Sequence, residues 1–497
     1  MVDADDSHLV TERRQKAARY RSAGKEPYPW DFPGRVPTSE VRAACQGLSN
    51  GAADEARTLK VAGRLKIVRQ HGKSAFLDLE DRSGAIQLFA RVDELGEEGY
   101  ADLLSVLDPG DIIGATGHPL VTRRGEPSVR VDSVVLLAKA IAPPPEKFHG
   151  LQDPEERLRR RYVDLLSSRE SLARFTARTL LVRELRAYLD GLDFLEVETA
   201  TIVPVASGAA AQPFVTHSNY LNAELQLRIA LELALKRLLV GGMERVYEVG
   251  RCFRNEDLDT THSPEFSMLE LYWAYADYSD MRRLVEGMFA RLAEVAAKAL
   301  PDLPAAREAP ELFRPPFATV DYVGELEKRS GIADLLGRSR EELRELARTV
   351  GATVPDDSPK GKFMDKLFEH YVEPHLIRPT FVLDFPADTT PLAKRHRSRP
   401  GLVERFELFA RGYELGNAYT ELNDPDEQEA RFKEQLSGRG EDHYALDTDF
   451  IEALRYGMPP ATGYGGGIER LVMALCGVSS IKDVILFPPV RARSPKA

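Results

Sequence analysis

A long antiparallel hairpin is the feature that most restricts how this chain can fold. Residues 245–253 alternate like a strand, a short polar loop follows at 257–263, and a second strand covers about 266–274. Successive side chains of a strand point to opposite faces, so Glu270 and Tyr272 share one face while leucines and a tryptophan occupy the other. The sequence therefore predicts a strand pair with one polar and one apolar face.

The same combination of a carboxylate and a phenol recurs later in the chain. Asn417, Tyr419 and Glu421 are spaced two apart, which puts them on one face of a second predicted strand. If this face meets that of Glu270 and Tyr272, the two strands form a cage for a compact cation on an apolar stem. The ε-ammonium of lysine has that form. A solvated strand face is the alternative for either strand alone.

Groups suited to phosphate and magnesium lie near these strands. Arg254 stands at the inner end of the hairpin, and its planar guanidinium suits a phosphate or carboxylate. We interpret residues 463–467 as a glycine-rich turn that opens a helix, with Arg470 in the first helical turn, where anions are favoured. Glu407 and Glu414 suit Mg²⁺, which takes a few carboxylates plus substrate oxygens. The alternative for the glycine-rich turn is a flexible connector, and the alternative for Glu407 and Glu414 is that they are ordinary surface carboxylates.

Changes in pattern divide the chain into three parts. Residues 1–56 are predicted to be a helical arm followed by a loop. Residues 57–142 hold five or so short strands and one helix, which fits a small closed barrel such as an OB-fold. A proline run leads into a larger unit, 143–497, in which we interpret a charged, largely helical stretch at about 308–375 as an insertion. We therefore expect an α+β protein.

Apolar spacing also predicts individual helices. In the larger unit they cover residues 168–189, 278–299 and 468–475, and Ser167 or Ser168 is the expected cap of the first. The single helix of the barrel region is expected at about 99–106.

Composition limits the classes of function. The net charge of −11 argues against a general polyanion-binding protein, although residues 11–25 and 58–92 are locally basic. The N-terminus lacks the layout of a signal peptide, and no run approaches the roughly 18 apolar residues of a membrane helix. Cys45, Cys252 and Cys476 form no metal-type pair. We expect a reduced, cytoplasmic protein with no membrane span.

Several runs of the sequence closely resemble class II aminoacyl-tRNA synthetases, and specifically the lysyl-tRNA synthetase family. The resemblance covers nearly the whole chain, with the motifs in the family's order and spacing. The most specific runs are Lys147 to Asp153, Phe253 to Glu256, His262 to Phe266, Met268 to Tyr272 with Ala274 to Asp277, Glu414 to Asp424, and Gly463 to Arg470 with Asp483 to Pro488. The family implies an antiparallel catalytic sheet of six or so strands flanked by helices, an N-terminal OB-fold that reads the anticodon, and a homodimer.

The resemblance also implies an activity and a role for each matching residue. L-lysine would be activated with ATP and Mg²⁺ to lysyl-adenylate and then passed to the 3′ end of tRNA(Lys). The implied roles are catalysis for Arg254 and Arg470; ATP binding for Arg254, Glu256, His262, Phe266 and Arg470; lysine binding for Gly208, Glu232, Glu270, Tyr272, Asn417, Tyr419 and Glu421; magnesium binding for Glu407 and Glu414; and reading of the central anticodon base for Arg69, Phe76 and Gln87.

The sequence departs from the family at five positions. Ala200 and Leu231 stand where proline is usual, Gln212 and Thr261 where arginine is usual, and Ser263 where asparagine is common. They cluster around the substrate and dimer regions. They suit a divergent paralogue, so the alternative function is a synthetase paralogue that passes lysine or a lysine analogue to a non-translational acceptor or a protein.

Three rival functions remain open. A sister ligase for aspartate or asparagine would need cationic groups in its pocket, but this sequence offers Glu270 and Glu421. Enzymes that attach lysine to a protein usually lack the OB domain. A non-catalytic protein on a synthetase scaffold would be marked by loss of Arg254 and Arg470, and both are present.

Overall fold

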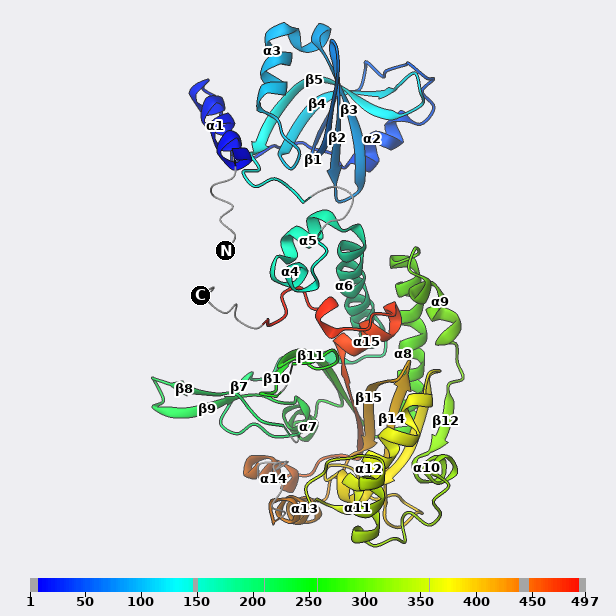
Figure 1. Cartoon of the computed structure of the whole chain (residues 1–497). Helices are drawn as coiled ribbons and strands as arrows, with labels where there is room; N and C mark the ends of the chain where they lie inside the picture. The colour runs from blue at the N-terminus through cyan, green and yellow to red at the C-terminus, as the bar shows by residue number, and fades with distance from the viewer. Residues whose placement is uncertain are drawn as a thin grey trace. The chain divides into compact units, whose positions relative to one another are not determined.

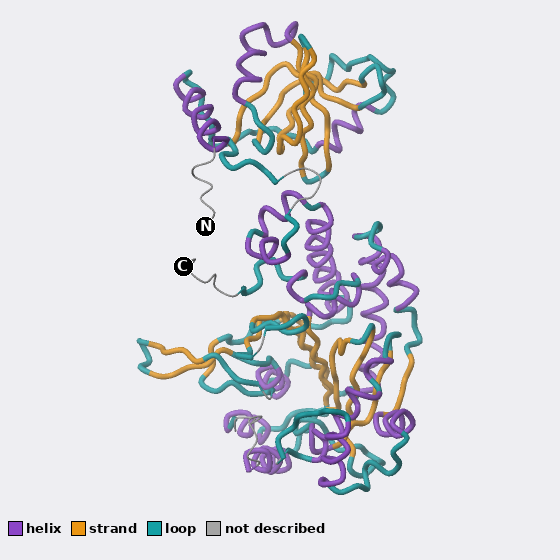
Figure 2. The backbone as a smooth tube through the Cα atoms, viewed as in Figure 1, coloured by secondary structure: helices purple, strands orange, loops and turns teal. Residues whose placement is uncertain are grey.

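The computed structural model describes residues 8–145, 151–209, 211–256, 258–356, 358–437 and 447–490. The chain forms two compact units, Met1–Leu151 and Gln152–Ala497 (Figures 1 and 2). Most of the predicted run 147–153, and residue 257 of the hairpin loop, lie outside the described residues. The predicted α+β class is confirmed, because one unit is a barrel and the other a sheet flanked by helices.

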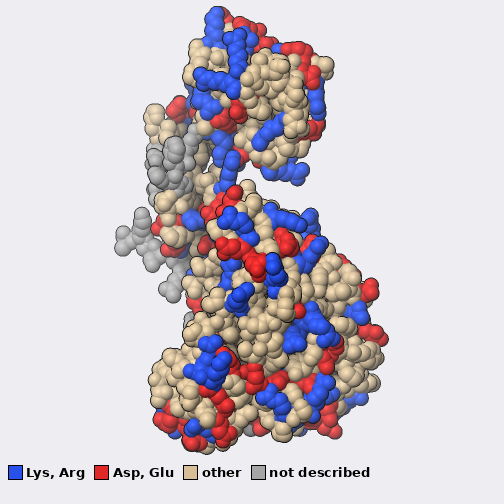
Figure 3. All heavy atoms as spheres, turned by 90° about the vertical axis from the view of Figure 1, so that its right-hand side faces the viewer, with Lys and Arg blue, Asp and Glu red and all other residues tan. Residues whose placement is uncertain are grey.

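A closed five-stranded barrel forms the first unit, as the turn spacing predicts. The strand order is β1-β2-β3-β5-β4. The strands are β1 (Leu59–His71), β2 (Ser74–Asp81), β3 (Gly84–Arg91), β4 (Ile112–Val121) and β5 (Pro127–Ala138). Alternate residues such as Leu77 and Leu79 fill the barrel, and closure leaves no unpaired sheet edge. Lysines and arginines are prominent on this unit in Figure 3.

Three helices accompany the barrel: α1 (His8–Ser22), α2 (Thr38–Cys45) and α3 (Val92–Val106). Val41 and Cys45 of α2 are buried in the barrel core, so the first 56 residues are not wholly an arm. The third helix begins earlier than predicted because two helical pieces join across a kink at Gly96, where φ is +73°.

An eight-stranded sheet is the frame of the larger unit. Its order is β12-β13-β14-β15-β16-β11-β10-β6. The strands are β6 (Leu195–Glu196), β10 (Arg245–Phe253), β11 (Glu265–Ala274), β12 (Ala318–Asp321), β13 (Thr380–Pro386), β14 (Leu402–Ala410), β15 (Tyr413–Thr420) and β16 (Ala461–Gly467). The centre is antiparallel, and only the two edge pairs, β12–β13 and β10–β6, are parallel.

The glycine-rich segment corrects one prediction. Residues 463–467 are not a turn but most of β16, which lies between β11 and β15 in the middle of the sheet. Glycine is a weak strand former, so local propensity points away from this structure. Pairing on both sides fixes the strand. The absence of side chains at its glycines leaves space for neighbouring side chains, which the site described below requires.

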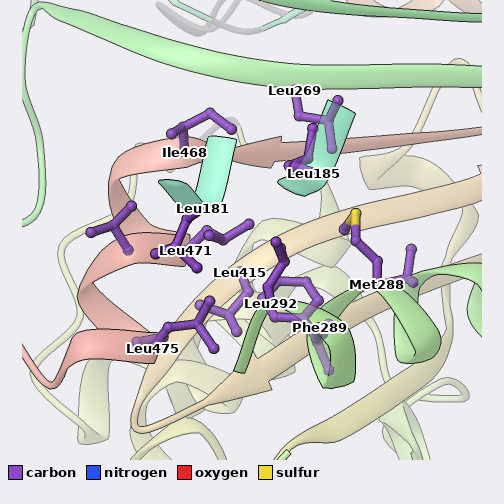
Figure 4. Close-up of a cluster of buried hydrophobic side chains, with 14 of the residues drawn as sticks. Leu181, Leu185, Leu269, Met288, Phe289, Leu292, Leu415, Ile468, Leu471 and Leu475 are labelled. Atoms are coloured by element: carbon purple, nitrogen blue, oxygen red, sulfur yellow. The ribbon is translucent and has the colours of Figure 1, made fainter. Parts of the chain in front are cut away.

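Four helices cover one face of this sheet: α6 (Arg169–Asp190), α8 (Tyr278–Ala299), α9 (Pro304–Leu312) and α15 (Ile468–Cys476). The three predicted helices are thereby confirmed. Ser168 is the cap of α6, and its side chain accepts the N–H of Ser171. Figure 4 shows the core beneath these helices, where α6, α8, α15 and the strands bring leucines, Met288 and Phe289 together.

The region predicted as an insertion, about 308–375, is partly integrated into the sheet. Helices α10 (Tyr322–Ser330), α11 (Arg340–Thr349) and α12 (Lys360–Tyr371) share a second hydrophobic core with strands β13 and β14. Strand β12 also pairs with β13, and Phe313 and Phe317 belong to the main core. The expectation of a purely separate insertion was therefore wrong.

The opposite side of the sheet carries α7 (Glu232–Val240) and α14 (Thr448–Arg455). A small sheet, β7-β9-β8, projects from this unit (Figure 1). The remaining elements are α4 (Pro154–Arg159), α5 (Arg161–Ser167), β7 (Ile202–Val203), β8 (Val215–Ser218), β9 (Ala223–Leu227), α13 (Pro425–Ser437) and three short 3-10 turns, η2 (Glu373–His375), η3 (Ala387–Thr389) and η4 (Ile481–Asp483). Among the described residues, no helix has both the length and the apolar character of a bilayer span.

Candidate active site

Two neighbouring cavities lie along strands β11, β15 and β16. One has a volume of about 320 Å³ and the other about 210 Å³. They share four lining residues, Arg254, Met268, Asn417 and Gly465. The larger also holds the predicted nucleotide residues, and the smaller holds most of the predicted lysine residues. We call them the outer cavity and the inner cavity.

Arg254 stands where the two cavities meet. Its guanidinium carbon is 5.1 Å from the centre of the Phe266 ring, close enough for a cation–π contact. The buried Nε of Arg254 donates no hydrogen bond to any described residue. A buried donor without a partner is costly, so a ligand that accepts from it would be strongly held. This arginine is free to bridge groups in both cavities.

The far wall of the outer cavity carries a second set of charged groups. Arg470, in the first turn of α15, lies 3.2 Å from Nε2 of His262 and 3.4 Å from a carboxylate oxygen of Glu414. Asp259 pairs with Nδ1 of His262 at 2.9 Å and accepts the backbone N–H groups of Thr261 and His262. These hydrogen bonds outweigh the effect of desolvation and hold the pKa of Asp259 below its ordinary value.

The inner cavity is acidic and aromatic, as the alternation of two strands predicts. Glu232, Glu270, Tyr272 and Tyr419 all line it. The hydroxyl of Tyr419 donates to Glu232 at 2.8 Å, and that of Tyr272 donates to Glu270 at 3.2 Å. Burial first, and the neighbouring charge of Glu232 second, raise the pKa of Glu270 to about 8. The two predicted faces therefore do converge.

Glu421 differs from the other predicted pocket residues. It is fully buried and does not line the inner cavity. Its carboxylate forms an ion pair with Lys236 of α7, and Lys236 also donates to Glu232 at 2.6 Å. Part of the predicted cation cage thus already holds a cation from the chain itself. The spacing of Glu232 and Lys236, four apart on an apolar helix, is the only sequence signal that could have revealed this.

Glycines let the walls of the inner cavity close. A Cβ at Gly463 would lie 2.3 Å from the Tyr272 ring and 2.4 Å from the Glu421 carboxylate. Gly208 has a φ of +91°, and a Cβ there would lie 3.2 Å from Ala230. Gly463 therefore excludes a larger residue by contact, and Gly208 disfavours one by its backbone conformation.

The two carboxylates expected to hold Mg²⁺ come from adjacent strands. Glu414 lines the outer cavity, while Glu407 forms an ion pair with Arg405 on β14. The pKa of Glu407 is raised to about 8, mainly by burial. The neighbouring Glu414 carboxylate also raises this pKa, and Arg405 partly opposes the rise. No three metal-binding side chains cluster anywhere in the described part of the chain. The pair fits Mg²⁺ only where a bound phosphate completes the ligands, which is how Mg²⁺ is usually held.

On the barrel, Arg69, Phe76 and Gln87 lie on neighbouring strands β1, β2 and β3. Phe76 stacks on Phe89, with ring centres 4.9 Å apart, and Arg69 makes two hydrogen bonds to Asp78, at 2.9 and 2.6 Å. Phe89 and Asp78 were not predicted. Phe89 lies two residues after Gln87 and therefore on the same strand face, and this spacing could have predicted it from the sequence. The arrangement offers a flat aromatic surface beside amide and guanidinium groups, which suits an unpaired base.

The unusual residues can also be located. Leu231, the residue before α7, donates its backbone N–H to Glu270 at 3.1 Å, a bond that a proline cannot make. Thr261 and Ser263 line the outer cavity, and Gln212 accepts the N–H of Asn255 through its carbonyl oxygen. Ala200 is exposed. Three of the five departures therefore touch the cavities or their carboxylates directly.

A fully antiparallel sheet centre with a bridging arginine, joined to an OB barrel, defines a class of protein. Residues 153–491 match the family described as tRNA synthetases class II (D, K and N), and residues 59–137 match the OB-fold nucleic acid binding domain. The chain belongs to the class II tRNA synthetases.

Within that class, three similar relatives are lysine–tRNA ligases. The chain is 45% identical to the lysine–tRNA ligase of Moorella thermoacetica and 45% identical to that of Carboxydothermus hydrogenoformans, in each case over 98% of this chain and 99% of the relative. It is 43% identical to the lysine–tRNA ligase of Methanoculleus marisnigri, over 100% of this chain and 97% of the relative.

Proposed function

We propose that this chain activates L-lysine with ATP and transfers the lysyl group to the 3′ end of tRNA(Lys). The observation that carries the proposal is Arg254, which lines both cavities and whose buried Nε has no hydrogen-bond partner among the described residues. A single guanidinium at that point can hold the carboxylate of an amino acid and the α-phosphate of ATP together. The full-length similarity to lysine–tRNA ligases supports lysine as the amino acid.

The inner cavity is the proposed site for lysine. Its carboxylates favour a cationic side chain and oppose aspartate, and Tyr272 and Tyr419 suit the apolar stem. The proposed lysine-binding residues are Gly208, Glu232, Glu270, Tyr272, Asn417, Tyr419 and Glu421, of which Glu421 lies behind the wall.

The outer cavity is the proposed site for ATP. Phe266 would stack on adenine and Glu256 would accept from it, while His262 and Arg470 would meet the outer phosphates. Attack of the lysine carboxylate on the α-phosphorus forms a new C–O–P linkage and expels pyrophosphate. That step needs alignment and charge neutralisation more than a protein base. Arg254 and Arg470 are the proposed catalytic residues.

Glu407 and Glu414 would hold Mg²⁺ together with phosphate oxygens of ATP. The bound ion would supply charge neutralisation at the phosphates. Arg405 must then release Glu407 or share it, because the two form an ion pair in this structure. The chain would therefore supply two carboxylate ligands to the ion, and the substrate would supply the remaining ligands.

The remaining proposals concern the partner RNA, assembly and location. We propose that residues 57–142 read the anticodon through Arg69, Phe76 and Gln87, after an N-terminal segment of 1–56, and that residues 143–497 are catalytic. We propose a homodimer, supported by exposed apolar side chains near the small projecting sheet. We propose a cytoplasmic location, supported by three free, buried cysteines.

The decisive experiment is amino-acid-dependent exchange of pyrophosphate into ATP with each of the twenty amino acids, followed by charging of total tRNA. Exchange with lysine alone, and then charging of tRNA(Lys), is the expected result. Exchange without charging would favour the second candidate, a paralogue that passes lysine or an analogue to another acceptor. The Leu231–Glu270 hydrogen bond favours that candidate, because it alters the pocket at a family proline. No exchange would contradict the proposal.

A further inference from the structure

Lys236 is a cation enclosed behind the inner cavity. It is 0% exposed. Its ammonium lies 2.6 Å from Glu232, forms an ion pair with Glu421, and sits 5.5 Å and 6.0 Å from the ring centres of Tyr419 and Phe450. Two carboxylates and two rings around one ammonium are the surroundings expected for a bound lysine side chain. Here the lysine belongs to the protein.

The position of Lys236 decides how it can act. Glu232 and Tyr419 line the inner cavity, whereas Lys236 and Glu421 do not, so Lys236 cannot touch a ligand there. Apart from its ion pair with Lys236, Glu421 accepts no hydrogen bond from any described residue. Any influence of Lys236 on the substrate must therefore pass through the two carboxylates that it holds.

Lys236 lowers the net negative charge of the inner cavity and its surroundings. Fully ionised, the pocket has three carboxylates, Glu232, Glu270 and Glu421, against two cations, Lys236 and Arg254. Arg405 also lines the cavity but is matched by Glu407. The excess is one negative charge, and lysine, with two ammonium groups and one carboxylate, brings one positive charge. Without Lys236 the excess would be two, which a buried site avoids by taking up a proton.

We propose that Lys236 is a positioning residue for lysine recognition, which keeps Glu232 and Glu421 in place and ionised so that one substrate molecule neutralises the pocket. The inference rests on the proposed function and adds the residue that sets the charge of its amino-acid site.

The groups around Lys236 make this role sensitive to pH. Glu232 faces it from α7, Tyr419 and Glu421 from β15 and the residue after it, and Glu270 and Tyr272 lie beyond on β11. Burial lowers the pKa of Lys236, but Glu232 and Glu421 outweigh burial and raise it overall. Burial raises the pKa of Glu421, against the pull of Lys236. Removing Lys236 must raise the pKa of Glu421 further.

The test is the Lys236→Met variant, which keeps an unbranched side chain one heavy atom shorter and removes its charge. Pyrophosphate exchange is measured against lysine concentration from pH 6.5 to 9. At pH 7 the KM for lysine should rise about tenfold or more, while kcat and the KM for ATP change less than about twofold. The midpoint of the pH profile of kcat/KM for lysine should move up by about one unit or more.

Lys433→Met is the matched control. Glu429 and Lys433 have the same spacing as Glu232 and Lys236, and their ion pair is also 2.6 Å long, but Lys433 is exposed on α13. This control should leave both the KM for lysine and the pH midpoint unchanged. A shift of either would mean that loss of any helical lysine is enough, which would overturn the proposal.

A double variant, Lys236→Met with Glu421→Gln, guards against misfolding of the single variant. It removes both charges of the buried pair, so it should fold, keep a raised KM for lysine and lose the alkaline shift. An unchanged KM in Lys236→Met, or a KM raised equally at every pH, overturns the inference while leaving the proposed function intact. A parent enzyme without lysine-dependent exchange overturns both.

Discussion

At the scale of single residues, the charge of the inner cavity depends on the hydrogen bonds and burial of its carboxylates. Glu270 is 3% exposed and accepts hydrogen bonds from the N–H of Leu231 and the hydroxyl of Tyr272. Both of its oxygens are therefore occupied before any substrate arrives. Its raised pKa, about 8, means that Glu270 holds a proton in the empty pocket at neutral pH, so the fully ionised pocket with three charged carboxylates is the state that binds lysine.

Lysine binding should consequently depend on pH in the parent enzyme. Below pH 8 the protonated Glu270 is neutral, and an arriving ammonium must displace its proton. The affinity for lysine should therefore increase as the pH rises from 6.5 to about 8 and then level off. Calorimetric titration with lysine would check this, because proton release appears as a dependence on buffer ionisation heat. A flat profile would contradict the assignment of Glu270.

Leu231→Pro tests the hydrogen bond that the family's usual residue cannot make. Loss of the N–H donor should raise the pKa of Glu270, since that bond lowers it. The pH midpoint for lysine use should move up by about 0.7 unit, the equivalent of a hydrogen bond of about 1 kcal/mol. Leu231→Ala keeps the N–H and is the control. If both variants shift the midpoint equally, packing rather than the hydrogen bond is responsible.

At the scale of elements, β16 is the strand on which the site depends most. Four of its seven residues are glycines, and side chains of β11 together with Glu421 occupy the space beside Gly463 and Gly465. Gly463→Ala should raise the KM for lysine strongly, because its Cβ would collide with Tyr272 and Glu421 at a cost of about 1–3 kcal/mol. Gly467→Ala is the control for the KM of lysine, since nothing lies within 4 Å of a Cβ there and Gly467 lines the outer cavity rather than the inner one. An equal rise in the KM for lysine in the two variants, measured by pyrophosphate exchange, would disprove the argument.

Some helices and strands could be predicted from the sequence and others could not. Helices α6 and α8 were predictable because their apolar spacing and caps are local, and so was the convergence of the faces that carry Glu270 and Tyr419. The glycine strand was not, since its pairing with β11 and β15 overrides propensity. Nor was the ion pair of Lys236 with Glu421, because it joins residues far apart in the chain and depends on packing alone.

At the scale of the whole molecule, exposed apolar side chains mark one region as a candidate interface between two copies. Leu195, Ile202, Val215 and Leu221 are 57, 52, 56 and 61% exposed, an unusual number of apolar side chains for the region around β6 to β9. If this region joins two copies, Ile202→Asp should convert a dimer into a 55.4 kDa monomer. Sedimentation equilibrium measures the mass directly. Ile377→Asp, at a position that is 53% exposed elsewhere, should leave the mass unchanged.

The bridging position of Arg254 has a thermodynamic consequence. A residue that lines both cavities, with a donor that no described residue accepts, is changed by whichever ligand binds first. Occupation of one cavity must therefore alter affinity in the other, and linkage requires the two effects to be equal in size. If lysine strengthens nucleotide binding by some factor, the nucleotide must strengthen lysine binding by that same factor. The two substrates thus report on each other, and neither affinity is a property of one cavity alone.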